Sequence, residues 1–149
     1  MKPTGKKKEK EIAELKEELT SLKEKFFQVD KTLDRQEQYS RRNCLLVHGL
    51  EEKNNEDTDQ EIINIVKNDL AEEITIHDID RTHQIGKRKL DNNVPQPIIV
   101  KFTRYNVRNR IFKTKKKLKG KTVSITESLT KRRVVELKKA REMYGFNNV

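Results

Sequence analysis

The sequence predicts an α+β protein, in which a long N-terminal coiled-coil helix precedes a small sheet with helices and a C-terminal helix. Three observations predict this class. Apolar residues recur at heptad spacing before residue 40, two short β-branched runs occupy residues 44–50 and 97–102, and helical patterns follow each run. Short apolar runs bounded by turn formers or charged residues are typical of buried strands.

The N-terminal region divides into a tail and a coiled coil. Residues 1–10 are basic and include Pro3 and Gly5, so we expect a disordered tail. Residues 11–40 form the predicted coiled coil, because their apolar positions alternate steps of three and four without a slip. We expect seven residues to mediate oligomerisation: Ile12, Leu15, Leu19, Leu22, Phe26, Val29 and Leu33.

The charged residues that flank this repeat favour a parallel homo-oligomer. With Ile12 at heptad position a, the pairs between g and the following e of a parallel partner are Glu11 with Lys16, Glu18 with Lys23, and Lys25 with Asp30. All three pairs have opposite signs. Dimer and trimer stay open, because Phe26 at a and Val29 at d fit neither simple rule. The alternative is a helix that packs on its own domain, which needs a wider apolar stripe.

Residues 41–129 form the predicted folded domain, which starts with a strand over 44–50. Strand alternation places Leu45 and Val47 in a core and Leu46 and His48 on the opposite face. A helix follows, with Asp57, Thr58 or Asp59 as its N-cap and an apolar face of Ile62, Ile63, Val66 and Leu70. A second strand is expected near 79–85, and residues 86–96 have the composition of a loop.

The second half of this domain continues with a strand, a helix and a strand. The third strand, over 97–104, places Ile98, Val100 and Phe102 on one face and Ile99 and Lys101 on the other. Asn106 is the expected cap of the second helix, and Gly120 ends it. A fourth strand covers 122–126 with Val123 and Ile125 inward, and Thr130 caps a last helix within 130–149 that ends near Tyr144.

The predicted order of elements, β-α-β-β-α-β, is the ferredoxin-like split-βαβ topology, with four antiparallel strands backed by two helices. An RRM-like sheet of this kind can present its open face to single-stranded nucleic acid. The formal net charge of +10 and the pI near 9.7 also indicate a polyanionic partner. The charge is segregated, since residues 51–80 are acidic and residues 81–121 are basic, which predicts a two-faced particle.

Composition limits the cellular compartments and the kinds of chemistry that we expect for this protein. Cys44 is the only cysteine, which excludes an intramolecular disulfide and a cysteine-based metal site. We expect an intracellular protein without a membrane span, because no apolar run is long enough and the start lacks a signal-peptide core. The glycines form no phosphate loop, and His48, His77 and His83 are scattered. We therefore expect no enzyme activity, no metal and no cofactor.

Basic residues supply the expected contacts with nucleic acid. They follow the second strand, lie on the third strand and continue after it: Arg81, Lys87, Arg88, Lys89, Lys101, Arg104, Arg108, Arg110, Lys113, Lys115, Lys116, Lys117, Lys119 and Lys121. Phosphate contacts by such groups give salt-sensitive and weakly sequence-specific affinity. The aromatic residues on which bases stack in RNA-recognition modules are missing at Leu46, Pro97 and Ile99, and Phe102 belongs to the core. Binding should therefore depend mainly on charge.

Several segments together resemble the first-open-reading-frame protein of LINE-type non-LTR retrotransposons. They are Ser40–Leu45, Val47–Glu51, Ile79–Gly86, Pro97–Phe102, and Leu118–Lys121 before Ile125–Thr130, and the similarity covers roughly residues 35–145. The resemblance implies a coiled-coil-tethered protein, typically a trimer, that coats its element's RNA and acts as a nucleic-acid chaperone. It also implies a location in cytoplasmic ribonucleoprotein particles or the nucleus.

The resemblance adds binding residues at the junction with the coil and in the last helix. The nucleic-acid-binding residues that we predict are Arg41, Arg42, Arg81, His83, Lys87, Arg88, Lys89, Lys101, Arg104, Lys119, Lys121, Arg132 and Arg133. Members of this family usually carry a further C-terminal domain, and the helix within 130–149 is expected to be its start or its remnant.

Two other functions compete with this interpretation. In the first, the coil recruits another protein, and the chain is an adaptor that binds no nucleic acid. In the second, the chain is a DNA-binding regulator of the basic-zipper type. That class needs a basic helix that runs continuously into the zipper, and Pro3 and Gly5 interrupt the basic segment.

Overall fold

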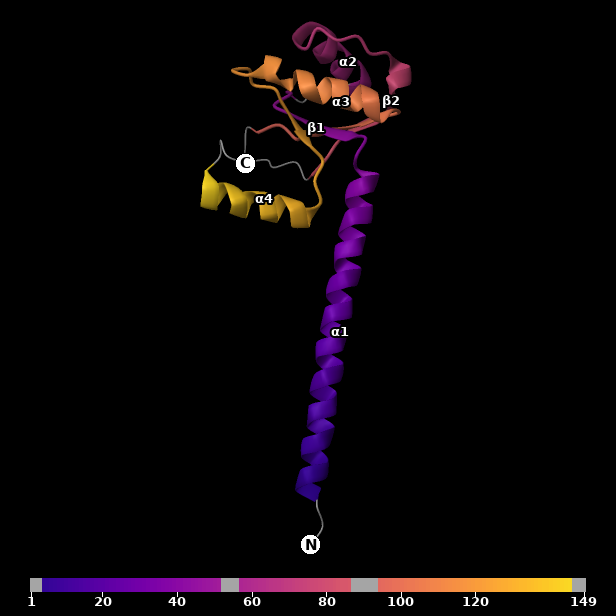
Figure 1. Ribbon diagram of the computed structural model, residues 1–149. Helices are drawn as coiled ribbons and strands as arrows, with labels where there is room; N and C mark the ends of the chain where they lie inside the picture. The colour runs from indigo at the N-terminus through magenta and orange to yellow at the C-terminus, as the bar shows by residue number, and fades with distance from the viewer. Residues whose placement is uncertain (1–3, 52–56, 87–93, 146–149) are drawn as a thin grey trace. The chain divides into compact units, whose positions relative to one another are not determined.

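The computed structural model describes residues 4–51, 57–86 and 94–145 (Figure 1). The protein is α+β, with a long N-terminal helix, a four-stranded antiparallel sheet and further helices. The chain divides into two compact units, Met1–Tyr39 and Ser40–Val149. We call the second one the folded unit.

The first unit consists of one helix, α1 (Thr4–Ser40). The helix begins at Thr4, so the expectation of a disordered tail was wrong for residues 4–10. Lysine and glutamate favour helix, and Pro3 is compatible with a position just before or at a helix start. The seven heptad residues, from Ile12 to Leu33, are each 51–74% exposed in the single chain. The helix therefore leaves its whole apolar stripe uncovered.

The sheet of the folded unit consists of β1 (Cys44–His48), β2 (Ile79–Gln84), β3 (Ile98–Phe102) and β4 (Ser124–Glu127). The strands lie in the order β2-β3-β1-β4, and every neighbouring pair is antiparallel. The predicted alternation is confirmed in the core, where the buried strand residues are Leu45, Val47, Ile79, Ile98, Val100, Phe102 and Ile125. Cys44 is also buried, although it lies on the opposite face of the sheet.

Helices cover this core-facing side of the sheet. They are α2 (Thr58–Asp69) and α3 (Tyr105–Lys113), and the short 3₁₀ segments η1 (Ile76–Asp78) and η2 (Thr114–Leu118) follow them. Figure 1 shows α2 and α3 on the same side of the sheet. Their apolar residues complete one core with the strands: Ile62, Val66, Leu70, Val107, Ile111 and Leu118. Burial of this apolar surface is the main term that stabilises the unit.

The helix ends test the predicted caps. The Asp57 carboxylate accepts a hydrogen bond from the Gln60 amide at 3.2 Å, and the Thr130 hydroxyl accepts one from the Arg133 amide at 3.3 Å. Both caps are confirmed. Asn106 was wrong as a cap, because α3 already begins at Tyr105 and the Asn106 side chain accepts from the adjacent Val107 amide at 2.9 Å.

The end of α3 also differs from the prediction. The α-helix ends at Lys113, and the chain continues as η2 up to Leu118 instead of as α-helix toward Gly120. The Thr114 hydroxyl donates to the Ile111 carbonyl at 2.8 Å. A side chain that occupies a carbonyl of the last turn competes with the continuing α-helical bond, which favours the tighter 3₁₀ turn.

The last helix, α4 (Lys131–Tyr144), ends near Tyr144 as predicted. No residue of α4 is fully buried. In Figure 1 this helix lies on the side of the sheet opposite to α2 and α3. It therefore does not contribute to the core described above.

Gly49 fixes the exit from β1. Its φ is +87°, a left-handed conformation that favours glycine, and a Cβ atom there would lie 2.1 Å from the Thr122 carbonyl oxygen. Only a residue without a side chain lets the segment before β4 approach so closely. This glycine therefore allows β4 to pair with β1 from Leu45 to His48.

Candidate nucleic-acid interface

The sheet has a second face, which α2 and α3 do not cover and on whose side α4 lies (Figure 1), and we call it the open face. The strand registers place nine side chains on it: Arg81, His83, Cys44, Leu46, His48, Ile99, Lys101, Ser124 and Thr126. Residues opposite one another in neighbouring strands point to the same face. The predicted outward placement of Leu46, His48, Ile99 and Lys101 follows from these pairings.

A β-bulge brings Arg81 to the open face. Ile79 pairs with Phe102 on the core side, yet Arg81, two residues later, pairs with Lys101 on the open side. Strict alternation would have turned Arg81 toward the core. The irregularity between Ile79 and Arg81 inserts one extra residue and re-aims the side chains that follow. The bulge therefore allows two cations to stand next to each other on neighbouring strands.

Positive charge gathers at one corner of the open face. Arg81, Lys101 and Cys44 lie in one row across β2, β3 and β1. Burial raises the pKa of the Cys44 thiol, while the charges of Lys101, Arg41, Arg81 and Arg108 act in the opposite direction. Arg108 belongs to α3 on the other face of the sheet, and the other three cations come from the segment before β1, from β2 and from β3.

Lys101 forms a weak ion pair at this corner. The Lys101 ammonium lies 3.8 Å from the Asp80 carboxylate, and both side chains are well exposed. Exposed ion pairs of this kind contribute little free energy, so the Lys101 ammonium stays available to a polyanion. Arg41 precedes β1, and its guanidinium donates to the Ser128 hydroxyl at 3.3 Å. This bond anchors Arg41 at the end of the sheet.

The rest of the open face is apolar and hydroxylated. His83, Ile99, Leu46 and Thr126 form the next row across all four strands. The His48 imidazole Nε2 lies 2.9 Å from the Thr126 hydroxyl, and burial lowers the pKa of His48. Among its described residues this face carries no aromatic ring apart from imidazole. The surface therefore offers charge and hydrogen bonds, and no phenyl, phenol or indole on which a base could stack.

The structure does not bring all predicted binding residues to this face. Lys87, Arg88 and Lys89 lie outside the described residues. Arg42 is exposed in the turn before β1. Arg132 and Arg133 lie on α4, which is on the same side of the sheet but is not part of its strands, and Arg132 pairs with Glu136 at 3.4 Å. Arg104, Lys119 and Lys121 lie in the connections of the helical layer instead.

Part of the basic segment after β3 forms contacts within the folded unit. Its side chains contact the C-terminal end of α2 and the residues after it. Arg110 pairs with Glu72 at 3.3 Å, Lys121 pairs with Asp69 at 3.0 Å, and the Lys117 ammonium donates to the Leu70 carbonyl at 3.1 Å. The acidic and basic halves of the sequence therefore neutralise each other in part, so the expected two-faced particle was too simple.

Arg108 was named among the basic residues that could contact nucleic acid, but its environment is internal. It is only 6% exposed, and its guanidinium pairs with the Glu127 carboxylate at 3.0 Å. The same guanidinium lies 5.6 Å from the Tyr105 ring centre and 4.9 Å from the Phe112 ring centre. Cation–π contacts of this kind stabilise a desolvated guanidinium. The spacing of Tyr105, Arg108 and Phe112 on one helix face was the signal in the sequence.

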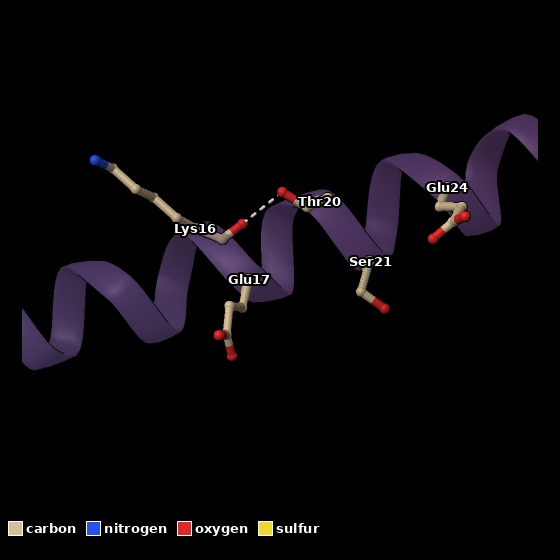
Figure 2. A pocket seen from close by; sticks show the side chains of 5 residues that line it. All are labelled: Lys16, Glu17, Thr20, Ser21 and Glu24. Atoms are coloured by element: carbon tan, nitrogen blue, oxygen red, sulfur yellow. Dashed lines mark hydrogen bonds between the residues drawn. The ribbon is translucent and has the colours of Figure 1, made fainter.

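The long helix α1 presents a polar face in addition to its apolar stripe. Figure 2 shows Lys16, Glu17, Thr20, Ser21 and Glu24 around a shallow depression, where the Thr20 hydroxyl donates to the Lys16 carbonyl at 2.9 Å. All five residues belong to one helix, so nothing encloses the depression. We assign no ligand to it. None of these five residues belongs to the apolar heptad positions.

Within residues 4–51, 57–86 and 94–145, no three side chains of His, Cys, Asp or Glu come together as metal ligands would. In the same ranges, no helix combines the length and apolar character that crossing a membrane requires.

No protein-family model matches this chain, and no curated protein matches it either.

Proposed function

We propose that this chain is a self-associating, non-enzymatic protein that binds RNA or another single-stranded nucleic acid on the open face. The observation that carries this proposal is the cationic corner, where Arg81 and Lys101 stand side by side and Arg41 lies near the same thiol. Neighbouring strands are about 4.8 Å apart, so adjacent cations can contact the same stretch of a phosphate backbone.

The chemistry of this face favours affinity without sequence reading. Cations that neutralise phosphates release counterions, which makes binding strong at low salt and weak at high salt. Base discrimination needs stacked rings or hydrogen bonds to base edges. The open face supplies Leu46 and Ile99 in place of stacking aromatics, so we expect similar affinity for different RNA sequences.

The folded unit is proposed to be a ferredoxin-like, RRM-like βαββαβ domain. Two observations support this: the elements from β1 to β4 follow that order, and β1 and β3 are the central strands. The element order and the strand order also support membership of the LINE first-open-reading-frame proteins. The segments that resemble this family, among them Val47–Glu51 around Gly49, support the same membership. A nucleic-acid chaperone that coats its element's RNA is the corresponding role.

We propose that the apolar stripe of α1 packs against the same helix of one or two further copies of the chain. The helices then run parallel in a dimer or a trimer. The opposite charges of Glu11 and Lys16, and of the two pairs that follow it along the helix, support this arrangement. Self-association places several folded units on one strand, which raises the effective concentration and the overall affinity. Weak contacts at each open face can then give stable coating.

A paired charge removal tests the proposal. Arg81→Gln with Lys101→Gln removes both cations of the row and should weaken binding of a single-stranded RNA by about tenfold or more at low salt. The matched control, Lys7→Gln with Lys8→Gln, removes the same charge from exposed positions of α1. Fluorescence anisotropy with two unrelated RNA sequences measures both. Equal losses in the two double variants would contradict a role of the open face.

The same experiment distinguishes nucleic-acid binding from the adaptor function. An adaptor of the kind described above would bind no RNA even at low salt, whatever its oligomeric state. Absence of RNA binding by the unmodified chain would therefore reject the nucleic-acid proposal and leave the coil as the functional element.

A further inference from the structure

The basic segment of the helical layer contains two kinds of cation. Arg110, Lys117 and Lys121 bind the end of α2 and its following residues, as described above. Arg108 is buried, and Arg104 precedes α3. Four further lysines have exposed side chains that form no ion pair with any described residue: Lys113, Lys115, Lys116 and Lys119. We call these four the outer lysines. The fold uses the first set and leaves the second set available.

The outer lysines continue a strip along α3. Tyr105, Asn109 and Lys113 are spaced by four residues, so they lie on one face of the helix. Val107 and Ile111 point to the core from the other side. The strip therefore faces away from the sheet, and η2 extends it with the remaining outer lysines.

An aromatic ring is held in place at the start of this strip. Tyr105 is 49% exposed, and its ring lies 5.6 Å from the buried Arg108 guanidinium. Further along, the Lys115 ammonium lies 4.0 Å from the centre of the Phe112 ring, whose distance from Arg108 is 4.9 Å. Rings and cations thus alternate along α3. A half-exposed ring beside unpaired cations is the combination that holds single strands by stacking and by phosphate contact.

We propose that α3 and η2 form a second surface for single-stranded nucleic acid, on the side of the folded unit opposite to the open face. This inference rests on the proposed function and adds a second strand to it. Each chain then holds two strands, one on each side. An acidic protein could pair with the lysines, but the exposed Tyr105 ring adds a contact that bases make and carboxylates do not.

Two strands on one chain have a functional consequence. Cations on both sides screen the repulsion between two polyanions, and a shared scaffold raises their local concentration. Complementary strands bound in this way meet more often than in free solution. The open face alone coats a strand, and the second surface brings another strand to it.

The number of short strands bound by each chain tests this inference. The full chain is titrated at low salt with an oligonucleotide of about eight nucleotides, within the usual site size of one domain. The outer-lysine variant carries Lys113→Gln, Lys115→Gln, Lys116→Gln and Lys119→Gln. Its matched control removes the same charge from α1 by Lys6→Gln, Lys7→Gln, Lys8→Gln and Lys10→Gln. Circular dichroism establishes that both variants are folded.

The expected result is two oligonucleotides per chain for the unmodified protein and the control, and one for the outer-lysine variant. Tyr105→Leu should weaken the second binding event by about tenfold, which corresponds to the loss of one stacked base. Two oligonucleotides bound to the outer-lysine variant would overturn the inference.

Other outcomes separate this inference from the function on which it rests. A single oligonucleotide per unmodified chain, lost only with Arg81→Gln and Lys101→Gln, would reject the second surface and keep the open face. No binding at all would reject both. Binding of polyglutamate at the outer lysines without a second oligonucleotide would also overturn the inference, in favour of an acidic protein partner.

Discussion

The two units of the chain differ in whether their apolar residues are exposed or buried. In α1, seven apolar residues at heptad positions are each more than half exposed. In the folded unit, β1, β3 and the helices α2 and α3 bury theirs in one core that the unit completes by itself. Both regions have strong apolar periodicity, but only the folded unit buries its apolar residues within a single chain.

From this difference we expect α1, and not the folded unit, to need a partner. An isolated helix gains little stability from propensity alone, and an exposed apolar stripe is costly in water. The α1 helix should therefore depend on association, while the folded unit should be stable as a monomer. Variants that damage one unit and spare the other can test this comparison.

The largest effect is expected from charges placed in the stripe of α1. Leu19→Asp with Leu22→Asp would bury unpaired carboxylates in the oligomer core, at a cost of about 3–5 kcal/mol for each. We expect monomers, and circular dichroism should show loss of α1 helix while the folded unit keeps its unfolding transition. Sedimentation equilibrium measures the mass.

The polar face of α1 offers a matched control for this variant. Thr20→Asp with Ser21→Asp adds the same charge to neighbouring positions in Figure 2 and should leave the mass unchanged. An unaltered mass for Leu19→Asp with Leu22→Asp would contradict the account of α1.

The next effect concerns the folded unit alone. Gly49→Ala forces a Cβ atom to within 2.1 Å of the Thr122 carbonyl oxygen at a left-handed backbone conformation. Strain and overpacking together should cost about 2–5 kcal/mol of unfolding free energy. Chemical denaturation measures this loss, and the oligomer mass should stay the same. Unchanged stability would show that the segment before β4 can move away from β1 at no cost.

A smaller change in stability, in this case an increase, is expected at the end of α2. Ala71 has a φ of 54°, in the left-handed region, and the Glu72 amide donates to the Val66 carbonyl at 3.1 Å. Ala71→Gly removes the Cβ strain, partly offset by greater freedom of the unfolded chain, so stability should rise by about 0.5–1 kcal/mol. A lower denaturation midpoint for this variant would contradict the assigned backbone conformation.

The smallest effect is a pH dependence that arises from His48. Burial lowers its pKa in the folded state, so the unfolded chain binds a proton first as the pH falls below about 6.5. The stability contribution of this group is therefore full above that pH and decreases below it. His48→Gln should flatten the stability profile between about pH 7 and pH 5. An equally steep profile in this variant would assign the dependence to other groups.

Much of the fold could be predicted from the sequence because it depends on local patterns. Alternation assigned the buried faces of β1 and β3, and Asp57 and Thr130 were readable as caps because their hydrogen bonds span three residues. The early start of α3 and its change to η2 depend on how β3 ends and on the Thr114 hydroxyl. Neither follows from periodicity.

The candidate site was less predictable, because long-range pairing decides which cations are available. Lys121 and Asp69 are 52 residues apart in the sequence, yet their side chains form an ion pair. Arg81 reaches the open face through a bulge that alternation does not anticipate. Sequence reasoning identified the basic segment but could not divide it into residues that hold the fold and residues that remain exposed.

One measurement tests the central claim that a self-associated particle binds nucleic acid by charge. Oligomer mass and affinity for a single-stranded RNA are determined on the same sample at about 50 mM and about 200 mM salt. The account predicts a dimer or trimer whose affinity falls by about tenfold or more between the two conditions. A monomer, or an affinity that does not change with salt, would contradict it.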